Sequence, residues 1–525
     1  MVVTPDTEIY LIRFDVTKQH QLTFSDEEGQ LGFFKALAEN GGVSLSASTY
    51  QRKDNIIRFP AWIDEIEKYN YCFFNNPSYS NKWYYCYIEN MEYINDSLTD
   101  VKIKLDVFQT YQFDFIYQQC FVEREHVNDD TRGLHTVPEG LETGDYFVNG
   151  YTYYSKFDSM CLIVTSSKPV NASSQFPNDV LDLTSSLNGI TTYGKVYVCE
   201  NSSQLTSLLQ AFSSNTYSGG TNSITNMYFV PRACINWDDV SLVPQVPDII
   251  YEYSSNFPLI YHFEISKPSS VDNYVPINNK LLSFPYCFLV GSNNNGSSNI
   301  YKYEKFTSSK CQFDFSCIPT PGASIKMSPY YYTQNNGYDE EEGLIAGKFP
   351  FMNWASQNYN DWISRNSLNL TGQFFVGGIQ TVAGIYTGEP TVAIDGLTKA
   401  FGVAKQMYEH KMIPDSSRGN INGADINTAQ DQNGFYFYKK SIKREYARII
   451  DNFFSMFGYK VNITKVPNIT GRRNWNYVKT TESIVESDIV PEKYLEEFKQ
   501  MLNSGITFWH DYGTFLDYSQ NNDII

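Results

Sequence analysis

Residues 100–107 read DVKIKLDV, the clearest alternation of charged and apolar side chains in the chain. A period of two is typical of a β-strand that packs on a core with one face and meets water with the other. The pattern predicts that Val101, Ile103, Leu105 and Val107 face a core. Their charged neighbours, from Asp100 through Lys102 and Lys104 to Asp106, are predicted to face the solvent, as in an antiparallel sheet with one wet face.

The sequence before this stretch predicts its partner in the sheet. Residues 83–88 form an aromatic run, WYYCYI, and the turn-forming residues Asn95, Asp96 and Ser97 separate the two runs. Two strand patterns joined by a short polar turn favour an antiparallel hairpin. A further strand is predicted at Glu8–Arg13, so the N-terminal part of the chain is predicted to be β.

The middle of the chain, about residues 126–320, changes character. Three short apolar runs are typical of buried strands, and a fourth stretch repeats its apolar residues with the period of a helix. The strands are Cys161–Val164, Val196–Cys199 and Met227–Pro231, and the helix is Ser203–Phe212. We predict an α+β domain here, inserted between β segments.

From about residue 321 β character returns with the run Pro329–Tyr332, and two helices are predicted near the end of the chain. The first has an apolar face opposite a charged face, and Gly458 stops it. The apolar face comprises Ile442, Tyr446, Ile449, Ile450, Phe453 and Phe457, and the charged face Lys443, Arg444, Arg448 and Asp451. The second begins at Pro491 and ends near Gly505, with Leu495 and Phe498 in its apolar stripe. Both stripes are interpreted as core or subunit packing.

Composition predicts a folded protein that repels nucleic acid. The chain has 525 residues, of which 42% are hydrophobic and 19% charged, which is typical of globular domains with real cores. The 41 tyrosines and 36 phenylalanines favour β structure and interfaces. The net charge of −18 repels phosphates and argues against an ordinary nucleic-acid binder. An acidic wall would nevertheless suit a passage for DNA, although ordinary solubility is the simpler interpretation.

The nine cysteines indicate a reducing folding compartment. Their number is odd, no C-x-x-C motif occurs, and most lie in apolar or aromatic runs. They are predicted to be reduced and buried, as in proteins folded in the cytoplasm. The N-terminal residues lack the pattern of a signal peptide, and no apolar run of about 18 residues predicts a constitutive transmembrane helix.

The stretch from Leu370 to Ala404 is the strongest functional signal in the sequence. No charged residue occurs between Asn366 and Gly388, and several glycines loosen the apolar run. Such a segment is either buried in a core or an oligomer, or it meets a membrane. Its apolar residues are Leu370, Phe374, Phe375, Val376, Ile379, Val382, Ile385, Tyr386, Val392, Ile394, Leu397, Phe401 and Val403.

The sequence offers no convincing catalytic or metal-binding constellation. None of the common nucleophile, zinc-protease or nucleotide-binding motifs occurs. His126 and His135 lie near several acidic residues, but their spacing fits no familiar zinc pattern, and surface polarity is the simpler interpretation. His510 and Asp511 have no nucleophile near them in the sequence. We therefore predict no enzyme activity and no cofactor.

Several blocks at both ends of the chain carry a family resemblance. They include residues 82–88 (KWYYCYI), 105–111 (LDVFQTY), 121–126 (FVEREH) and 505–510 (GITFWH). With further blocks at 91–95, 138–141, 326–330 and 476–480, they resemble the distal tail tube (tail knob) proteins of small short-tailed phages of Gram-positive bacteria, of the Salasmaviridae and Rountreeviridae type. The residues that carry the resemblance include Trp83, Tyr85, Asp106, Gln109, Thr110, Glu123, Arg124, Glu125, His126, Lys326, Tyr477, Lys479, Trp509 and His510.

The resemblance implies a β-rich, α+β fold with tail-tube-like β-barrel domains, an inserted α+β domain and a hexameric ring. It implies a long hydrophobic loop that plugs the lumen and then penetrates the host membrane. The implied division is 1–125 (tube barrel), 126–320 (insertion), 321–368 (tube), 369–434 (hydrophobic loop) and 435–525 (tube with helices). The implied partners are other copies of the chain, the collar or connector, tip and appendage proteins of the tail, the passing double-stranded DNA and the host membrane. The protein is expected in the virion, after assembly in the host cytoplasm.

Two other functions are weighed against this one. A receptor-binding or carbohydrate-binding tail adhesin would use the many aromatic residues to stack on sugars, but no repeats or fibrous section are evident. A cell-wall hydrolase needs a carboxylate pair, which an acidic chain always offers by chance and which no pattern here supports.

Overall fold

The computed structural model describes residues 7–51, 55–76, 82–166, 168–171, 186–187, 190–191, 195–215, 223–244, 246, 249–253, 258–294, 296–319, 324–333, 343–348, 351–355 and 434–525. The chain forms two compact units. Unit 1 comprises Met1–Gly144, Asn273–Leu281 and Arg444–Ile525, and unit 2 comprises Asp145–Asp272 and Leu282–Lys443. The predicted five-part division remains a prediction. The apolar segment from Leu370 to Val403 lies outside the described residues.

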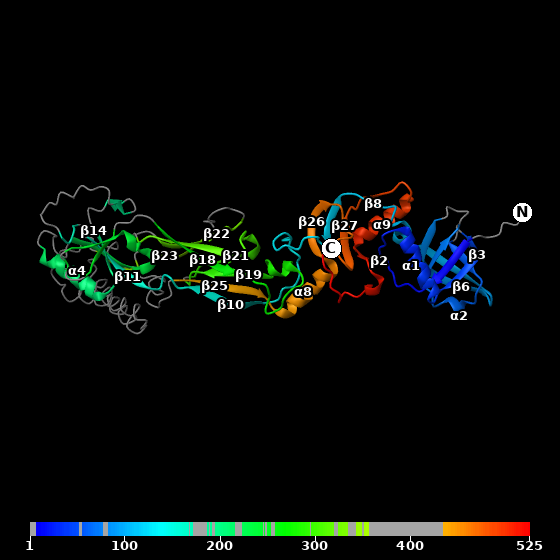
Figure 1. Ribbon diagram of the computed structural model, residues 1–525, viewed down its shortest axis with the longest axis horizontal. Helices are drawn as coiled ribbons and strands as arrows, with labels where there is room; N and C mark the ends of the chain where they lie inside the picture. The colour runs from blue at the N-terminus through cyan, green and yellow to red at the C-terminus, as the bar shows by residue number, and fades with distance from the viewer. Residues whose placement is uncertain are drawn as a thin grey trace, which may run out of the picture. The chain divides into compact units, whose positions relative to one another are not determined.

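The N-terminal part of unit 1 is a closed six-stranded barrel in which every pairing is antiparallel (Figure 1). The predicted β character of this region is confirmed. Around the barrel the strands are β1 (Thr7–Ile12), β3 (Val43–Gln51), β4 (Ile56–Phe59), β7 (Leu98–Leu105), β6 (Trp83–Asn95) and β5 (Tyr71–Asn75).

The predicted hairpin is present, but it ends differently from the sequence pattern. β6 and β7 pair around the turn with Asn95 opposite Leu98, and Val101 and Ile103 are buried as predicted. The prediction that Asp106 faces solvent is wrong. Asp106 is buried, because its side chain accepts a hydrogen bond from the backbone N–H of Gln109 and thereby starts helix α3 (Val107–Tyr111). Val107 accordingly lies in a helix and not in the strand.

A second, five-stranded sheet completes unit 1, with a parallel pair at one edge. In order across the sheet the strands are β2 (His20–Leu22), β29 (Ile506–Trp509), β27 (Trp475–Thr481), β9 (Cys120–Glu125) and β26 (Tyr459–Lys465). A small two-stranded sheet joins β8 (Ile116–Tyr117) to β28 (Val485–Glu486). Besides α3, the described α-helices of unit 1 are α1 (Glu27–Glu39), α2 (Ile63–Ile66), α8 (Arg444–Phe457) and α9 (Glu492–Ser504).

One aromatic core is shared by the barrel and the five-stranded sheet. Phe34 of α1 and Tyr71 of β5 pack in the same cluster as Trp475 and Trp509, and all four side chains are buried. A second core holds α9 on the sheet, where Phe498 stacks on Phe115 with ring centroids 4.3 Å apart. Aromatic contacts of this kind add to the hydrophobic free energy of burial.

The two C-terminal helices are confirmed, but the faces of the first are not. In α9 the predicted stripe is buried, and Gly505 ends the helix with a φ of 96°. In α8 the predicted apolar residue Ile449 is 67% exposed, whereas the predicted solvent-facing residue Asp451 is fully buried. Ile442 lies outside the helix, in a strand of unit 2. Helical spacing predicted that Asp451 faces the solvent. It could not show that Asp451 is buried, because the donors of its hydrogen bonds come from a distant part of the chain.

The described residues of unit 2 form three larger sheets and one α-helix, α4 (Ser202–Ser214). The first sheet is β10 (Tyr146–Tyr154), β25 (Phe435–Ile442), β19 (Cys287–Ser292) and β20 (Ser298–Tyr301). The second is β16 (Val240–Leu242), β17 (Tyr251–Tyr253), β14 (Lys195–Cys199), β11 (Met160–Ser166), β15 (Ile224–Pro231) and β24 (Phe351–Ala355). The third is β18 (Leu259–Ser266), β21 (Lys310–Cys317), β22 (Ser324–Tyr330) and β23 (Leu344–Lys348), and β12 (Ser186–Leu187) pairs with β13 (Ile190–Thr191).

The predicted mixture of strands and a helix in the middle of the chain is confirmed. The three apolar runs predicted as strands lie in β11, β14 and β15, and β11 is the antiparallel neighbour of the other two. Leu205, Leu208 and Phe212 of α4 pack in a core with Tyr197. All nine cysteines are buried thiols, in agreement with the prediction from composition. Within the described part of the chain, none of the helices has the length and apolar character needed to cross a membrane.

Candidate functional site

Most of the residues that carry the family resemblance come together in unit 1. Asp106, Gln109 and Thr110 lie just after the end of β7, and the run Glu123–His126 forms the end of β9 and the residue that follows it. Tyr477 and Lys479 lie on the neighbouring strand β27, and Trp509 and His510 lie at the end of β29. Trp83 and Tyr85 belong to β6 of the barrel, and Trp83 lies under the ammonium group of Lys35. Lys326 is the exception, because it lies on β22 in unit 2.

A buried polar network surrounds the carboxylate of Asp106. The backbone N–H of Gln109 donates to it at 3.2 Å, the hydroxyl of Tyr71 at 3.1 Å and the side chain of Gln21 at 3.3 Å. Gln109 in turn donates to the side-chain oxygen of Gln21 at 2.9 Å and to the carbonyl of Leu22 at 2.7 Å. Burial raises the pKa of Asp106 to about 6, although these donors oppose the shift. The network therefore ties β2 of the sheet to the barrel.

Thr110 extends this junction to the barrel strand β6. The backbone N–H of Tyr85 donates to the Thr110 hydroxyl at 3.1 Å. The same hydroxyl donates to the backbone carbonyl of Tyr85 at 3.2 Å. Burial raises the pKa of the Tyr85 hydroxyl above its usual value. Both residues are thus positioned to hold α3 against the barrel.

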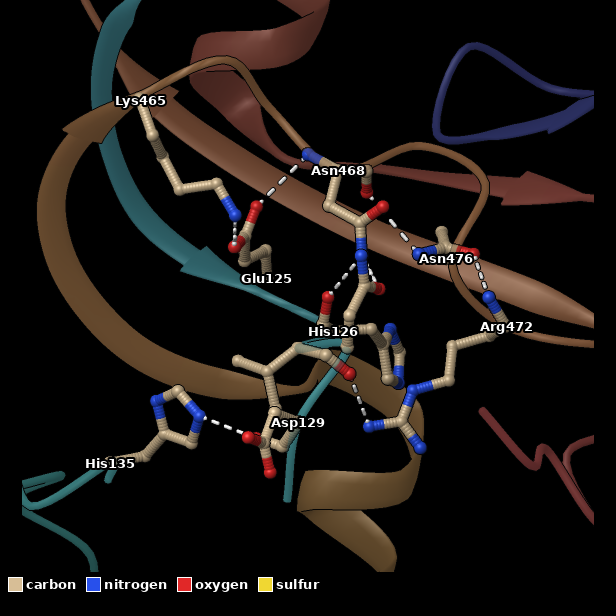
Figure 2. A network of polar contacts seen from close by, with 10 residues as sticks. Glu125, His126, Asp129, His135, Lys465, Asn468, Arg472 and Asn476 are labelled. Carbon is tan, nitrogen blue, oxygen red and sulfur yellow. Dashed lines mark hydrogen bonds and ion pairs between the residues drawn. The ribbon is translucent and has the colours of Figure 1, made fainter. Parts of the chain in front are cut away.

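Glu125 is a buried anchor for the loop that follows β26. Lys465 donates to its carboxylate at 2.6 Å, and the backbone N–H of Asn468 donates at 3.0 Å (Figure 2). Asn468 also donates to the carbonyl of His126 at 2.8 Å. Because Glu125 is 1% exposed, both of its partners are needed to offset the loss of hydration.

His126 is held in its neutral form by two backbone groups. Its Nδ1 accepts the backbone N–H of Tyr477 at 2.7 Å, so its Nε2 carries the proton and donates to the carbonyl of Ser455 at 3.1 Å. Burial lowers the pKa of His126 to about 3, and the positive charge of Arg472 acts in the same direction. Both ring nitrogens are occupied, so His126 has no lone pair left for a metal or a proton-transfer step.

The histidines considered as metal ligands do not form a site. His135 lies on an exposed loop, where its Nε2 is 2.8 Å from the carbonyl oxygen of Asp129 (Figure 2). Among the residues that the structure describes, no group of three or more His, Cys, Asp and Glu side chains has the geometry to hold a metal ion. The interpretation of both histidines as surface polarity is wrong for His126, which is buried.

A buried ion cluster joins three separate parts of unit 1. Glu139, whose side chain is fully buried, is paired with both Arg124 and Lys280. The backbone N–H of Lys460 also donates to it at 2.9 Å, and Arg124 donates to the carbonyl of Gly458 at 2.7 Å. Burial lowers the pKa of Lys280, and the charge of Glu139 opposes this shift. Glu139 lies in the block 138–141 that carries the family resemblance, whereas Lys280 was not recognisable from sequence, because no motif or spacing connects it to Arg124.

The neighbouring pair of Glu123 and Lys479 is more exposed. Their side chains lie 2.8 Å apart, and Thr481 donates to Glu123 at 2.6 Å. Hydrogen bonding from Lys479 lowers the pKa of Glu123. Exposed pairs of this type contribute little to stability, so this one fixes strand register at most.

At the end of β29, Trp509 packs on Trp475 with ring centroids 5.1 Å apart. His510 follows it, with Nδ1 2.7 Å from the hydroxyl of Thr23 and Nε2 3.0 Å from the side-chain oxygen of Asn476. Burial lowers the pKa of His510 to about 4. His510 is therefore neutral at ordinary pH, and it links three segments. The Thr23 hydroxyl beside it is within donor distance of the carbonyl of Trp509, at 3.0 Å.

Taken together, these residues form a polar core that joins segments far apart in the sequence. Its histidines are neutral, its carboxylates are occupied by donors, and its ring nitrogens are engaged. Such an arrangement supports a rigid scaffold better than acid–base or nucleophilic chemistry.

Comparisons with known proteins agree with this description. The family model "Bacillus phage phi29, Tail knob protein gp9, C-terminal domain" matches residues 251–523, and "Caudoviral major tail protein N-terminus" matches residues 7–116. The tail knob protein gp9 of Bacillus phage phi29 is 26% identical, with 88% of each chain covered. Its counterpart from Bacillus phage B103 is 26% identical, with 95% of each chain covered. The solved structure of the bacteriophage C1 tail knob protein gp12 has a similar fold, with a TM-score of 0.64 and 16% identity over 99% of this chain and 100% of that one.

Proposed function

This chain belongs to the family of the phage phi29 tail knob protein gp9, and from that premise we propose that six copies form the ring of the distal tail tube. The chain is a structural component of the phage tail, as its relatives are, and not an enzyme. The observation that carries the proposal of a tube is the closed barrel, whose strands lie within the residues matched by the N-terminal model of caudoviral major tail proteins.

We further propose that the ring conducts the DNA genome during ejection. Support comes from the net charge of −18, because an acidic or neutral channel wall would let DNA pass without binding it. The buried thiols and the absence of disulfides among the nine cysteines suit assembly in the reducing host cytoplasm. Partners of the ring would be the other proteins of the tail, namely the collar or connector, the tip and the appendages.

The hydrophobic segment is proposed to plug the lumen and then to enter the host membrane. It belongs to the chain between β24 and β25, where the sequence from Leu370 to Ala404 is almost free of charge. Apolar surface is worth about 25 cal/mol per Å² when it leaves water, so a membrane becomes a favoured partner once the segment is released. In lipid the backbone must satisfy its own hydrogen bonds, so the segment would become helical or surround a water-filled pore.

Electron microscopy and liposome leakage test these two proposals separately. Negative-stain images of the purified protein are expected to show sixfold rings or short tubes with a central channel, and monomers or threefold fibres would contradict the ring.

Deletion of Leu370–Ala404 is expected to leave the rings intact and to abolish leakage of a trapped dye from liposomes. The double change Phe374→Glu and Phe375→Glu, which keeps the chain length, should act in the same way. Unchanged leakage in both variants would contradict the membrane role.

A second candidate function is a carbohydrate-binding tail adhesin, which one observation favours. Tyr151 and Tyr153 on β10 lie opposite Tyr438 and Tyr436 on β25, and Tyr151 is 67% exposed. Exposed aromatic rings on one sheet face suit stacking on sugars. Binding of the purified protein to host cell-wall polysaccharide that is lost on Tyr151→Ala would support this function, and equal binding by the variant would remove it.

A further inference from the structure

Unit 1 carries an exposed aliphatic patch with a basic rim. The short segment Asn273–Leu281 leaves Val275 and Ile277 exposed at 72% and 69%, although its backbone is anchored to the buried Asp451. The guanidinium of Arg448 on α8 lies 5.9 Å from the ring centre of Tyr274 in the same segment. We call Val275, Ile277, Arg444 and Arg448 the basic patch.

The arginines of the basic patch are not explained by helix stability. Arg444 is the first residue of α8, and Arg448 lies one turn further on. Cations near a helix N-terminus oppose the helix dipole, which favours acidic residues there. Glu445 is the acidic residue of this turn. A basic rim on a chain with a net charge of −18 is complementary to an acidic surface.

A second exposed aliphatic patch lies elsewhere in unit 1 and has an acidic rim. Ile484 and Ile489 flank β28, and Ile116 of β8 pairs with Glu486 across the two-stranded sheet. All three isoleucines are exposed, and Glu482, Glu486 and Asp488 are exposed among them. We call these six residues the acidic patch. In Figure 1 the helix α8 and the strand β8 lie apart within unit 1.

We propose that the acidic patch of one copy of this chain binds the basic patch of the next copy. The inference rests on the proposed ring, and it names the surfaces that hold neighbouring copies together. The basic patch offers two exposed aliphatic side chains and the acidic patch three, and each has charges of one sign at its rim, which is the anatomy of a specific protein interface. Charges of opposite sign steer the two surfaces together and disfavour contacts between like patches.

The difference between the two patches determines the symmetry of the contact. A surface that binds a different surface on the next copy forms a head-to-tail interface, and such an interface closes into a ring when the rotation allows it. A pair of identical surfaces would instead stop at a dimer. Two complementary patches on one chain thus match a ring of several copies.

Charge reversal tests the contact with a built-in rescue. Arg448→Glu and Asp488→Arg each place like charges in the interface, so each variant alone is expected to raise the concentration for half-assembly by about tenfold or more, as measured by sedimentation velocity. An equimolar mixture of the two variants is expected to assemble like the wild type, because every contact between unlike copies pairs opposite charges again. Imaging of the mixture should show rings.

Matched controls separate this effect from net charge and from misfolding. Lys104→Glu and Glu89→Arg make the same charge changes at exposed barrel positions and are expected to leave assembly unchanged. Circular dichroism should show that all variants are folded, since Arg448→Glu is favourable for the helix dipole. Wild-type rings together with variants that assemble normally, or a mixture that fails to recover, would overturn the proposed contact alone. A wild-type chain that stays monomeric would overturn the ring as well.

Discussion

Asn278 and Asp451, which are far apart in the sequence, form a hydrogen-bonded pair inside unit 1. The backbone N–H of Asn278 donates to the buried carboxylate at 3.0 Å, and its side chain donates at 2.8 Å. The backbone N–H of Ile277 and the hydroxyl of Tyr274 complete the shell, each at 2.7 Å. One carboxylate on α8 thereby fixes the segment Asn273–Leu281, whose neighbours in sequence belong to unit 2.

The change Asp451→Ala is expected to destabilise unit 1 by about 3 kcal/mol or more. It leaves several buried donors without an acceptor, and each such group costs about 1–3 kcal/mol. Urea unfolding should show the loss, and limited proteolysis should show faster cleavage within 273–281. Asn452→Ala, at the adjacent exposed position, is the control and should be nearly neutral. Equal stability of the two variants would contradict the anchoring role.

The change Glu139→Ala is expected to cost about 3–5 kcal/mol, because it leaves the buried cations of Arg124 and Lys280 without their carboxylate. Lys280→Met should restore part of the stability in the Glu139→Ala background, since it removes one uncompensated charge. Chemical denaturation of the single and double variants measures the coupling as a double-mutant cycle. Glu142→Ala, at an exposed position of the same loop, provides the control. Additive losses would show that the two residues do not interact.

His126 is expected to make the protein less stable in acid. Its folded-state pKa of about 3 lies below the ordinary value of 6.5, so the unfolded chain binds the extra proton between these values. Stability from the neutral ring is complete above pH 6.5 and is lost as the pH falls, by about 2 kcal/mol at pH 5. His126→Gln should reduce this slope, as measured by urea unfolding at pH 5 and pH 7, whereas His135→Gln should retain it. An unchanged slope in His126→Gln would contradict the burial of a neutral ring.

Asp106 is expected to act in the opposite direction. Its folded-state pKa of about 6 lies above the ordinary value of 3.8, so the folded protein binds the extra proton between these values. Its contribution to stability is therefore greatest at low pH and falls by about 1 kcal/mol between pH 5 and pH 7. Asp106→Asn keeps an acceptor for the N–H of Gln109 and should remove this component. The difference in unfolding free energy between wild type and variant, followed from pH 5 to 7, should shrink or change sign as the pH rises. A constant difference would show that Asp106 stays ionised.

Local periodicity in the sequence was sufficient to predict several elements of the fold. The hairpin of β6 and β7, the helices α4 and α9, and the stop at Gly458 follow from side-chain spacing and from turn and cap residues. Each depends on contacts among neighbours in the chain, and apolar burial dominates their energies. The sequence blocks that carry the family resemblance indicated most of the polar core in the same way.

The sequence by itself therefore determined the β-rich character, the mixed middle region and the membership of a tail knob family. Only the tertiary structure decided which charged residues are buried. Asp106, Asp451 and Glu139 carry the same charge as any surface carboxylate, and burying them is unfavourable until specific donors surround them. Those donors come from Gln21, Asn278 and Lys280 on other segments, so the chain must fold before these carboxylates acquire their structural roles.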